Sequence, residues 1–128
     1  MSTNFLQALQ SDLADGAVTF DEAVIRLADA DRDRDIAVLI GRRLSVDEDV
    51  VVRALTTRWQ EAAAMLCRTA GLGANGYSAV LRMRRRAGRT LDASPATLLA
   101  SYLQRRRASQ EELAEVLHVY ARQAAEQT

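Results

Sequence analysis

The stretch Asp35-Ile36-Ala37-Val38-Leu39 is echoed 26 residues later by Glu61-Ala62-Ala63-Ala64-Met65. The same offset relates further pairs of like residues: Arg42 and Arg68, Val46 and Leu72, Leu55 and Leu81. A period of about 20–50 residues is typical of stacked helix pairs, because each unit must bury its apolar face against a neighbour. The sequence therefore predicts an all-α fold of short stacked antiparallel helix pairs, a HEAT-like or α-solenoid-like bundle.

Start and stop signals divide the chain into about eight helices. A Ser or Thr with Glu or Gln three residues later satisfies two backbone N–H groups at a helix start. This pattern begins at Thr19, Ser45, Thr57 and Ser109, and Ser94-Pro95 gives a fifth start. Glycines mark three predicted helix ends, at Gly16, Gly71 and Gly88. The predicted helices span residues 4–14, 19–30, 33–44, 46–56, 58–70, 75–87, 95–107 and 110–126.

Apolar spacing within these ranges predicts one-sided helices around a shared core. The stripes are Phe20, Ala23, Val24 and Leu27; Trp59, Ala62, Ala63, Leu66 and Ala70; and Leu113, Val116, Leu117 and Tyr120. The range 33–44 is apolar nearly all round and is expected to be central. Val50-Val51-Val52 favours a strand through its β-branched side chains, but the cap at Ser45 and the helical spacing favour a helix.

Length and composition indicate one domain over residues 1–128. A single cysteine, Cys67, excludes an internal disulfide and a cysteine-rich zinc site. No secretion signal and no long apolar run is found, so we expect a cytoplasmic protein without membrane association.

All 17 basic residues are arginine, and the net charge of zero conceals a polarity. Residues 1–64 hold seven arginines and twelve acids, whereas residues 65–128 hold ten arginines and five acids. One part of the surface is therefore expected to be strongly positive.

Three sets of residues resemble metal or catalytic sites but lack a feature that such a site requires. The range 29–35 alternates acids like a calcium loop, but the required glycine and glutamate are replaced by Arg34 and Ile40. His118 shares a helix face with Glu111 and Glu115, away from any candidate nucleophile. Cys67 lies in an alanine-rich helix and is expected to be buried and inert. We therefore predict no catalytic, cofactor or metal site, and no enzyme.

The arginines are the remaining candidates. If the helix predicted at 75–87 continues to residue 89, four arginines lie within one arc of its surface: Arg82, Arg85, Arg86 and Arg89. Arg84 lies on the apolar side and is expected to reach solvent or a carboxylate, and Arg105-Arg106-Arg107 are expected to close the helix at 95–107. The arc is either a solvated face or a binding surface for an acidic protein, and the acidic half of a second copy would also fit it.

Residues 63–87 suggest an alternative, because their apolar spacing is similar to that of a helix-turn-helix unit, with Gly71 at the turn. A recognition helix reads bases from its N-terminal part, here Asn75 and Ser78, whereas the arginines lie at the far end. Nucleic-acid binding is therefore the second hypothesis, after a protein-interaction or regulatory module.

The block Ala64-Met65-Leu66-Cys67-Arg68, with Ala70-Gly71-Leu72 and Val80-Leu81-Arg82, resembles the bacterial domain of unknown function family 2336. The similarity covers about residues 16–89 and also includes Gly16-Ala17-Val18-Thr19 and the opening stretch. The resemblance implies a bacterial, HEAT-like helical protein and supplies no catalytic residue. Members of that family carry further helical repeats in front, so it also implies a short member or a stand-alone C-terminal part.

Overall fold

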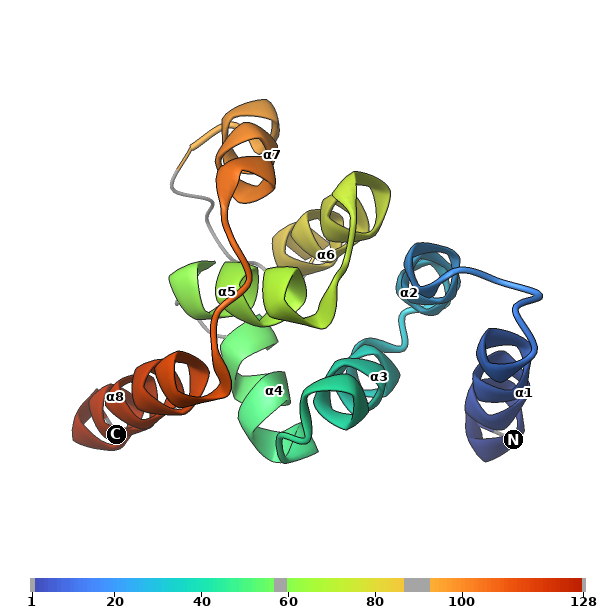
Figure 1. Cartoon of the computed structure of the whole chain (residues 1–128), viewed down its shortest axis with the longest axis horizontal. Coiled ribbons are helices and arrows are strands. Elements are labelled where there is room, and N and C mark those ends of the chain that lie inside the picture. Colours follow the sequence, from blue (N-terminus) through green and yellow to red (C-terminus); the bar gives the residue numbers. More distant parts are fainter. Residues whose placement is uncertain (1, 57–59, 87–92, 128) are drawn as a thin grey trace.

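The computed structural model describes residues 2–56, 60–86 and 93–127. This part of the chain folds into eight helices without a strand (Figure 1). They are α1 (Ser2–Ala14), α2 (Phe20–Asp29), α3 (Asp33–Leu44), α4 (Glu48–Thr56), α5 (Gln60–Ala70), α6 (Ala74–Arg86), α7 (Pro95–Gln104) and α8 (Gln110–Gln127). The prediction of an all-α fold of about eight packed helices is confirmed, and Val50-Val51-Val52 lies in α4.

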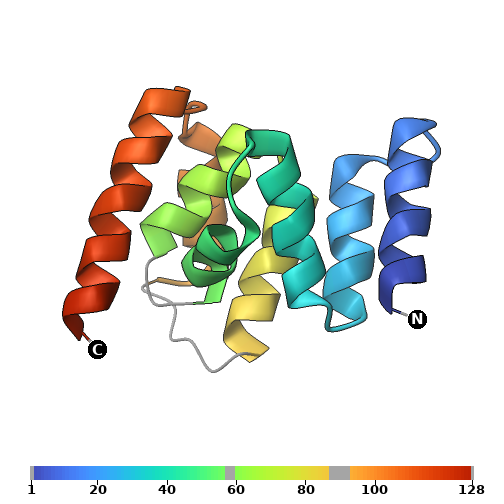
Figure 2. The same ribbon diagram turned by 90° about the horizontal axis from the view of Figure 1, so that it is seen from below.

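The helices form an elongated array with the two termini at opposite ends (Figures 1 and 2). Helix α3 is central, as predicted, and packs against α2, α4 and α5. The outer helices each rest mainly on one neighbour: α1 on α2, α7 on α6 and α8 on α5. The interior is therefore concentrated in α2 to α6.

One continuous apolar core joins these helices. Its largest buried aliphatic side chains are Leu27, Ile36, Ile40, Leu55, Leu66 and Leu72. The predicted stripes of α2 and α5 are buried as expected, and Leu113 of α8 is buried with Leu117 packed beside it. Trp59 lies outside the described residues.

Helix ends follow a common backbone pattern in which a residue with positive φ closes the helix. Gly16 and Gly71 adopt φ of 75° and 90°, as expected for glycine, while Asp31 and Ser45 adopt φ of 56° and 57°. The predicted cap at Ser45 is therefore wrong, since this residue ends α3 instead of starting α4. Asp47 takes that place, because its Oδ1 accepts a hydrogen bond of 2.9 Å from the Asp49 N–H.

The other described start signals are confirmed. The hydroxyl oxygens of Thr19, Ser94 and Ser109 each accept a hydrogen bond from the backbone N–H three residues later, at distances of 3.1–3.2 Å. Thr57 and Gly88 lie outside the described residues.

Two turns that lie 26 residues apart in the sequence have the same backbone structure. Ser45 and Gly71 hold the same place, and the following N–H groups donate to carbonyls five residues back, Val46 to Gly41 at 2.9 Å and Leu72 to Cys67 at 3.0 Å. The packing of the two units differs, however, because α4 lies along α3 whereas α6 lies along α2.

Helices α2 and α6 are fastened at both ends. The Asp21 carboxylate of α2 accepts hydrogen bonds from the N–H groups of Gly73 and Gly76 at the start of α6, both at 2.8 Å. At the other end, Arg86 of α6 donates to the Ala28 carbonyl of α2 at 2.6 Å. Equivalent ends therefore meet, and the two helices run parallel. A Cβ on Gly76 would overlap the Leu72 side chain and lie 3.0 Å from the carboxyl carbon of Asp21, so glycine suits this position.

Leu39→Ala and Leu66→Ala are each expected to lower the free energy of unfolding by about 2–5 kcal/mol, because both side chains are buried in the core. Urea denaturation measures the change. Leu103→Ala is the matched control, since this leucine is 46% exposed and its truncation should change stability little. Losses below about 1 kcal/mol for both core variants would contradict the assigned core.

Asp21→Ala is expected to lower the free energy of unfolding by about 1–3 kcal/mol, because two N–H groups of α6 lose their acceptor. Asp15→Ala, the same change at an exposed aspartate without a described side-chain partner, is the control. Equal stability of the two variants in urea would show that the carboxylate does not fasten α2 to α6.

Candidate protein-interaction surface

Arg84 is part of the core. Its side chain is 1% exposed, and Nη1 donates to the carbonyl oxygens of Ala54 at 3.2 Å and Leu55 at 2.7 Å, in the last turn of α4. The expectation that Arg84 would reach solvent is therefore wrong. A cation suits this place, because the carbonyl groups of a helix C-terminus carry partial negative charge.

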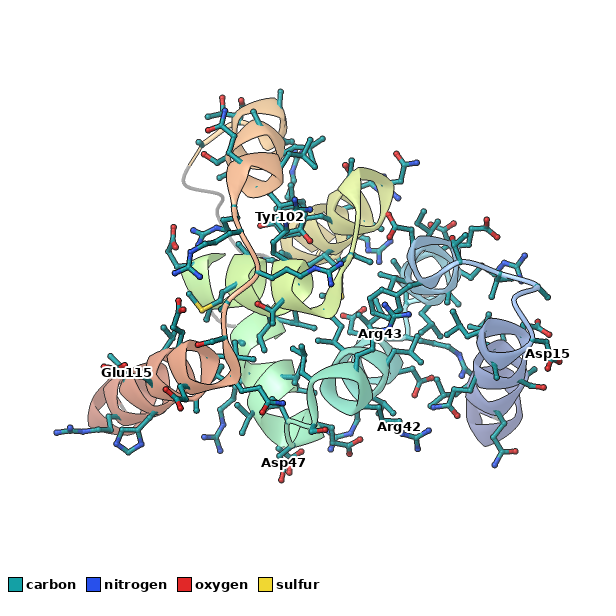
Figure 3. All side chains as sticks on the ribbon, viewed as in Figure 1. Asp15, Arg42, Arg43, Asp47, Tyr102 and Glu115 are labelled. Carbon is teal, nitrogen blue, oxygen red and sulfur yellow. The ribbon has the colours of Figure 1, made fainter. Side chains whose placement is uncertain are left out.

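Three more arginines bind helix C-termini in the same way. Arg86 donates to the Ala28 carbonyl at the C-terminus of α2, and its guanidinium lies 3.3 Å from the Asp31 carboxylate. Arg43 of α3 donates to the Ala70 carbonyl of α5 at 3.1 Å, and its guanidinium lies 4.1 Å from the centre of the Phe20 ring (Figure 3). Arg68 of α5 donates to the Leu103 carbonyl in the last turn of α7 and to the carbonyl of Arg105, which follows that helix. Much of the arginine content thus holds helices together.

The run Arg105-Arg106-Arg107 lies in the connection after α7, so the prediction that it closes that helix is wrong. The helix ends at Gln104 because the chain becomes extended at Arg105, whose carbonyl accepts a hydrogen bond of 2.8 Å from Arg68 Nε. The Arg105 side chain pairs with Glu61. Arg106 pairs with Glu112 at 2.9 Å and, through this hydrogen bond, lowers the pKa of that carboxyl.

Of the predicted arc, Arg82, Arg85 and Arg86 all have exposed side chains, but Arg86 is bound to the end of α2. Neither Arg82 nor Arg85 forms a hydrogen bond or ion pair with another described residue. The structure thus brings Arg82 and Arg85 together on one face of α6, directs Arg86 toward α2, and does not describe Arg89.

A hollow of about 300 Å³ lies beside these two arginines, between α6 and α7. We call it the α6–α7 hollow; its described lining is Ser78, Leu81, Arg82, Arg85, Pro95, Ala96 and Leu99. The described lining combines an aliphatic floor with two cations, and none of its described residues is an acid. This arrangement suits an anionic ligand that also carries an apolar group.

The position of α7 relative to α6 is fixed by a stack of two tyrosines. The rings of Tyr77 and Tyr102 lie 3.8 Å apart with an interplanar angle of 4°, and the Tyr102 hydroxyl donates to the Leu72 carbonyl at 2.5 Å. Figure 3 shows Tyr102 on the inner side of α7. Burial raises the pKa of both phenols, so both stay protonated at neutral pH. Because the tyrosine stack holds α7 against α6, the α6–α7 hollow does not require a ligand to form.

A second hollow of about 340 Å³ lies against the same tyrosine stack, and Glu61 and Arg105 contribute to its lining. These two charged side chains pair with each other. The second hollow thus presents a neutralised ion pair, whereas the α6–α7 hollow presents two cations without a described counter-charge.

The three other candidates from the sequence are His118, the range 29–35 and Cys67, which lie on different elements. His118 is exposed on α8. In the range 29–35, Arg32 pairs with Asp35 at 2.9 Å, and no group of three or more potential ligands suited to a metal ion occurs among the described residues. Cys67 is buried, and desolvation raises the pKa of its thiol to about 12.

The unit at residues 63–87 does contain two helices joined by a short turn, α5 and α6. The start of α6 is engaged within the protein, because its N–H groups are bound to Asp21 and α2 lies along it. Of the residues expected to read bases, Asn75 is exposed and Ser78 is partly exposed, whereas the neighbouring Gly76 and Tyr77 are buried. The start of α6 is thus bound to α2 on one side and keeps Asn75 exposed on another.

Comparison of the chain with protein-family models, with curated proteins and with solved structures found no match. The resemblance to domain of unknown function family 2336 therefore stays a prediction. None of the described helices is long and apolar enough to cross a membrane.

Sequence reasoning missed the residues that join the helices, above all Asp21, Arg43, Arg68 and Tyr102. One signal was available for Asp21: the residues before α6, Gly71-Leu72-Gly73, offer no side chain able to cap it. An uncapped helix start in a core indicates a cap from elsewhere in the chain.

Cys67 in the folded protein is expected to resist modification by 5,5′-dithiobis(2-nitrobenzoate) at pH 8, because the thiol is inaccessible and its pKa lies near 12. In denaturing urea the same thiol should react at the rate of an ordinary exposed cysteine. The absorbance of released thionitrobenzoate measures both rates. Rapid labelling of the folded protein would contradict the burial of Cys67.

Proposed function

We propose that this chain is a non-catalytic protein-interaction module of the bacterial cytoplasm, and that Arg82 and Arg85 receive an acidic partner protein. The observation that carries the proposal is that two exposed arginines, Arg82 and Arg85, line the α6–α7 hollow. Exposure without a described partner also occurs at Arg26, Arg42 and Arg53. Arg43, Arg68, Arg84 and Arg86 bind helix C-termini, whereas Arg82 and Arg85 are exposed without a described intramolecular partner.

The surroundings of the two arginines support this role. Arginine is enriched at protein interfaces, where its guanidinium binds carboxylates and its stem packs on apolar groups. An exposed ion pair alone contributes at most about 1 kcal/mol, so the arginines need an additional source of affinity. The adjoining α6–α7 hollow offers it, because apolar surface buried there would add to the two ion pairs.

The proposal includes a HEAT-like role for the array, in which packed helices hold an interaction surface on a rigid frame. The packed helix pairs and the resemblance to the bacterial family support this role. The bacterial and cytoplasmic assignments rest on that resemblance and on the sequence.

Nucleic-acid binding is the weaker hypothesis, because a carboxylate occupies the start of α6. Asp21 would repel phosphates at the place where a recognition helix approaches DNA. The exposed arginines lie in the C-terminal half of the helix, where they could contact phosphates without reading bases.

Arg82→Glu/Arg85→Glu is expected to abolish formation of a stoichiometric complex with an acidic protein, because two attractions become two repulsions. Affinity purification from the native cell, repeated with the identified partner in purified form, measures the loss. The control is Arg42→Glu/Arg53→Glu, which makes the same change at exposed arginines of α3 and α4 (Arg42 is labelled in Figure 3).

Equal capture by both double variants would overturn the proposal. Binding of duplex DNA that weakens steeply with salt and is lost in Arg82→Glu/Arg85→Glu would assign the surface to nucleic acid instead.

A further inference from the structure

We propose that the α6–α7 hollow receives an aliphatic side chain from an acidic segment of the partner, while carboxylates on either side of that side chain pair with Arg82 and Arg85. This inference rests on the proposed function and specifies the ligand of that surface. The ligand is a short peptide segment with one leucine-like anchor between acidic residues.

The floor of the hollow explains the aliphatic anchor. Leu81 of α6 and Leu99, Pro95 and Ala96 of α7 contribute carbon surface, and the volume of about 300 Å³ lies at the lower end of the range for small-molecule pockets. A hollow of this size suits one or two side chains better than a large cofactor. Because the tyrosine stack holds α7 in place, the hollow does not have to form on binding.

The charges around the hollow explain the acidic flanks. Arg82 and Arg85 are three residues apart on a helix, so their guanidinium groups lie on neighbouring turns of one face. The first turn of α7 borders the same hollow through Pro95 and Ala96, and its helix dipole adds positive potential. Carboxylates are therefore favoured on both sides of the anchor.

A peptide segment fits these features better than nucleic acid does. The phosphates of a nucleic acid would satisfy the arginines, but the backbone offers no aliphatic group for Leu81 and Leu99. The combination of apolar floor and cationic rim instead matches an interface, where an apolar centre is surrounded by polar pairs.

The probe for the test is a fluorescein-labelled peptide of about ten residues with one leucine flanked by glutamates. A second peptide replaces the leucine with serine, and fluorescence anisotropy measures both affinities. The wild-type protein is expected to bind the leucine peptide about tenfold more tightly or better, because burial of one leucine side chain corresponds to at least that factor.

Two protein variants locate the effect. Ala96→Trp places a large ring at the hollow from an exposed position on α7, so it should remove the preference for leucine. Ser101→Trp, at an exposed position on a different face of α7 and outside the lining of the α6–α7 hollow, is the control and should keep the preference. Circular dichroism of both variants verifies that α7 stays folded.

The outcomes separate this inference from the proposed function. Equal affinity for the two peptides, with binding lost in Arg82→Gln/Arg85→Gln, would overturn the anchor while leaving the arginine face as the interaction surface. Leucine-peptide binding that is unchanged in Arg82→Gln/Arg85→Gln would overturn both. Tighter binding of single-stranded or duplex DNA than of the leucine peptide, or self-association that Ala96→Trp abolishes, would assign the hollow to a different occupant and overturn the inference.

Discussion

The fold depends on charged side chains that bind the ends of helices distant in the sequence. Asp21 holds the start of α6, and Arg86 holds the end of α2, so each charge meets the helix terminus of opposite partial charge. Together they align α2 and α6 in parallel over their whole length. Parallel neighbours require a long connection, and here α3, α4 and α5 provide it and fill the space on one side with apolar side chains.

The same principle accounts for the separation of charge along the chain. The acidic first half and the basic second half meet within one molecule in the ion pairs of Asp31 with Arg86 and of Glu61 with Arg105. Arginine suits these places because its planar group offers five donors and keeps its charge when buried. Arg84, whose guanidinium binds two carbonyl oxygens in the core, is the clearest case.

The sequence predicted the helices well and the contacts between them poorly. Caps such as Thr19 and Ser109 act within three residues, and apolar spacing follows from the helical period, so both can be read locally. The error at Ser45 arose because its hydroxyl suited a start signal while its backbone ended α3. Nothing within three or four residues of Asp21 or Arg86 shows that their partners lie more than 50 residues away. Helical geometry predicted that Arg82 and Arg85 would be exposed. The bond from Arg86 to α2 could not be predicted in this way, because it depends on where α2 lies.

Several arginines of the second half of the chain bind other parts of the protein, whereas Arg82 and Arg85 are exposed and have no described partner. In the connection after α7, Arg105 and Arg106 pair with Glu61 and Glu112. Other exposed arginines, such as Arg26 and Arg53, form no ion pair with a described residue, so exposure alone does not mark a binding face. Arg82 lies on a helix whose other arginines at positions 84 and 86 are bound. Its exposure together with Arg85, beside an apolar hollow held open by the tyrosine stack, therefore distinguishes this face from the rest of the described surface. A partner that covers the hollow would remove this exposed apolar area from water and place its acids beside the two arginines.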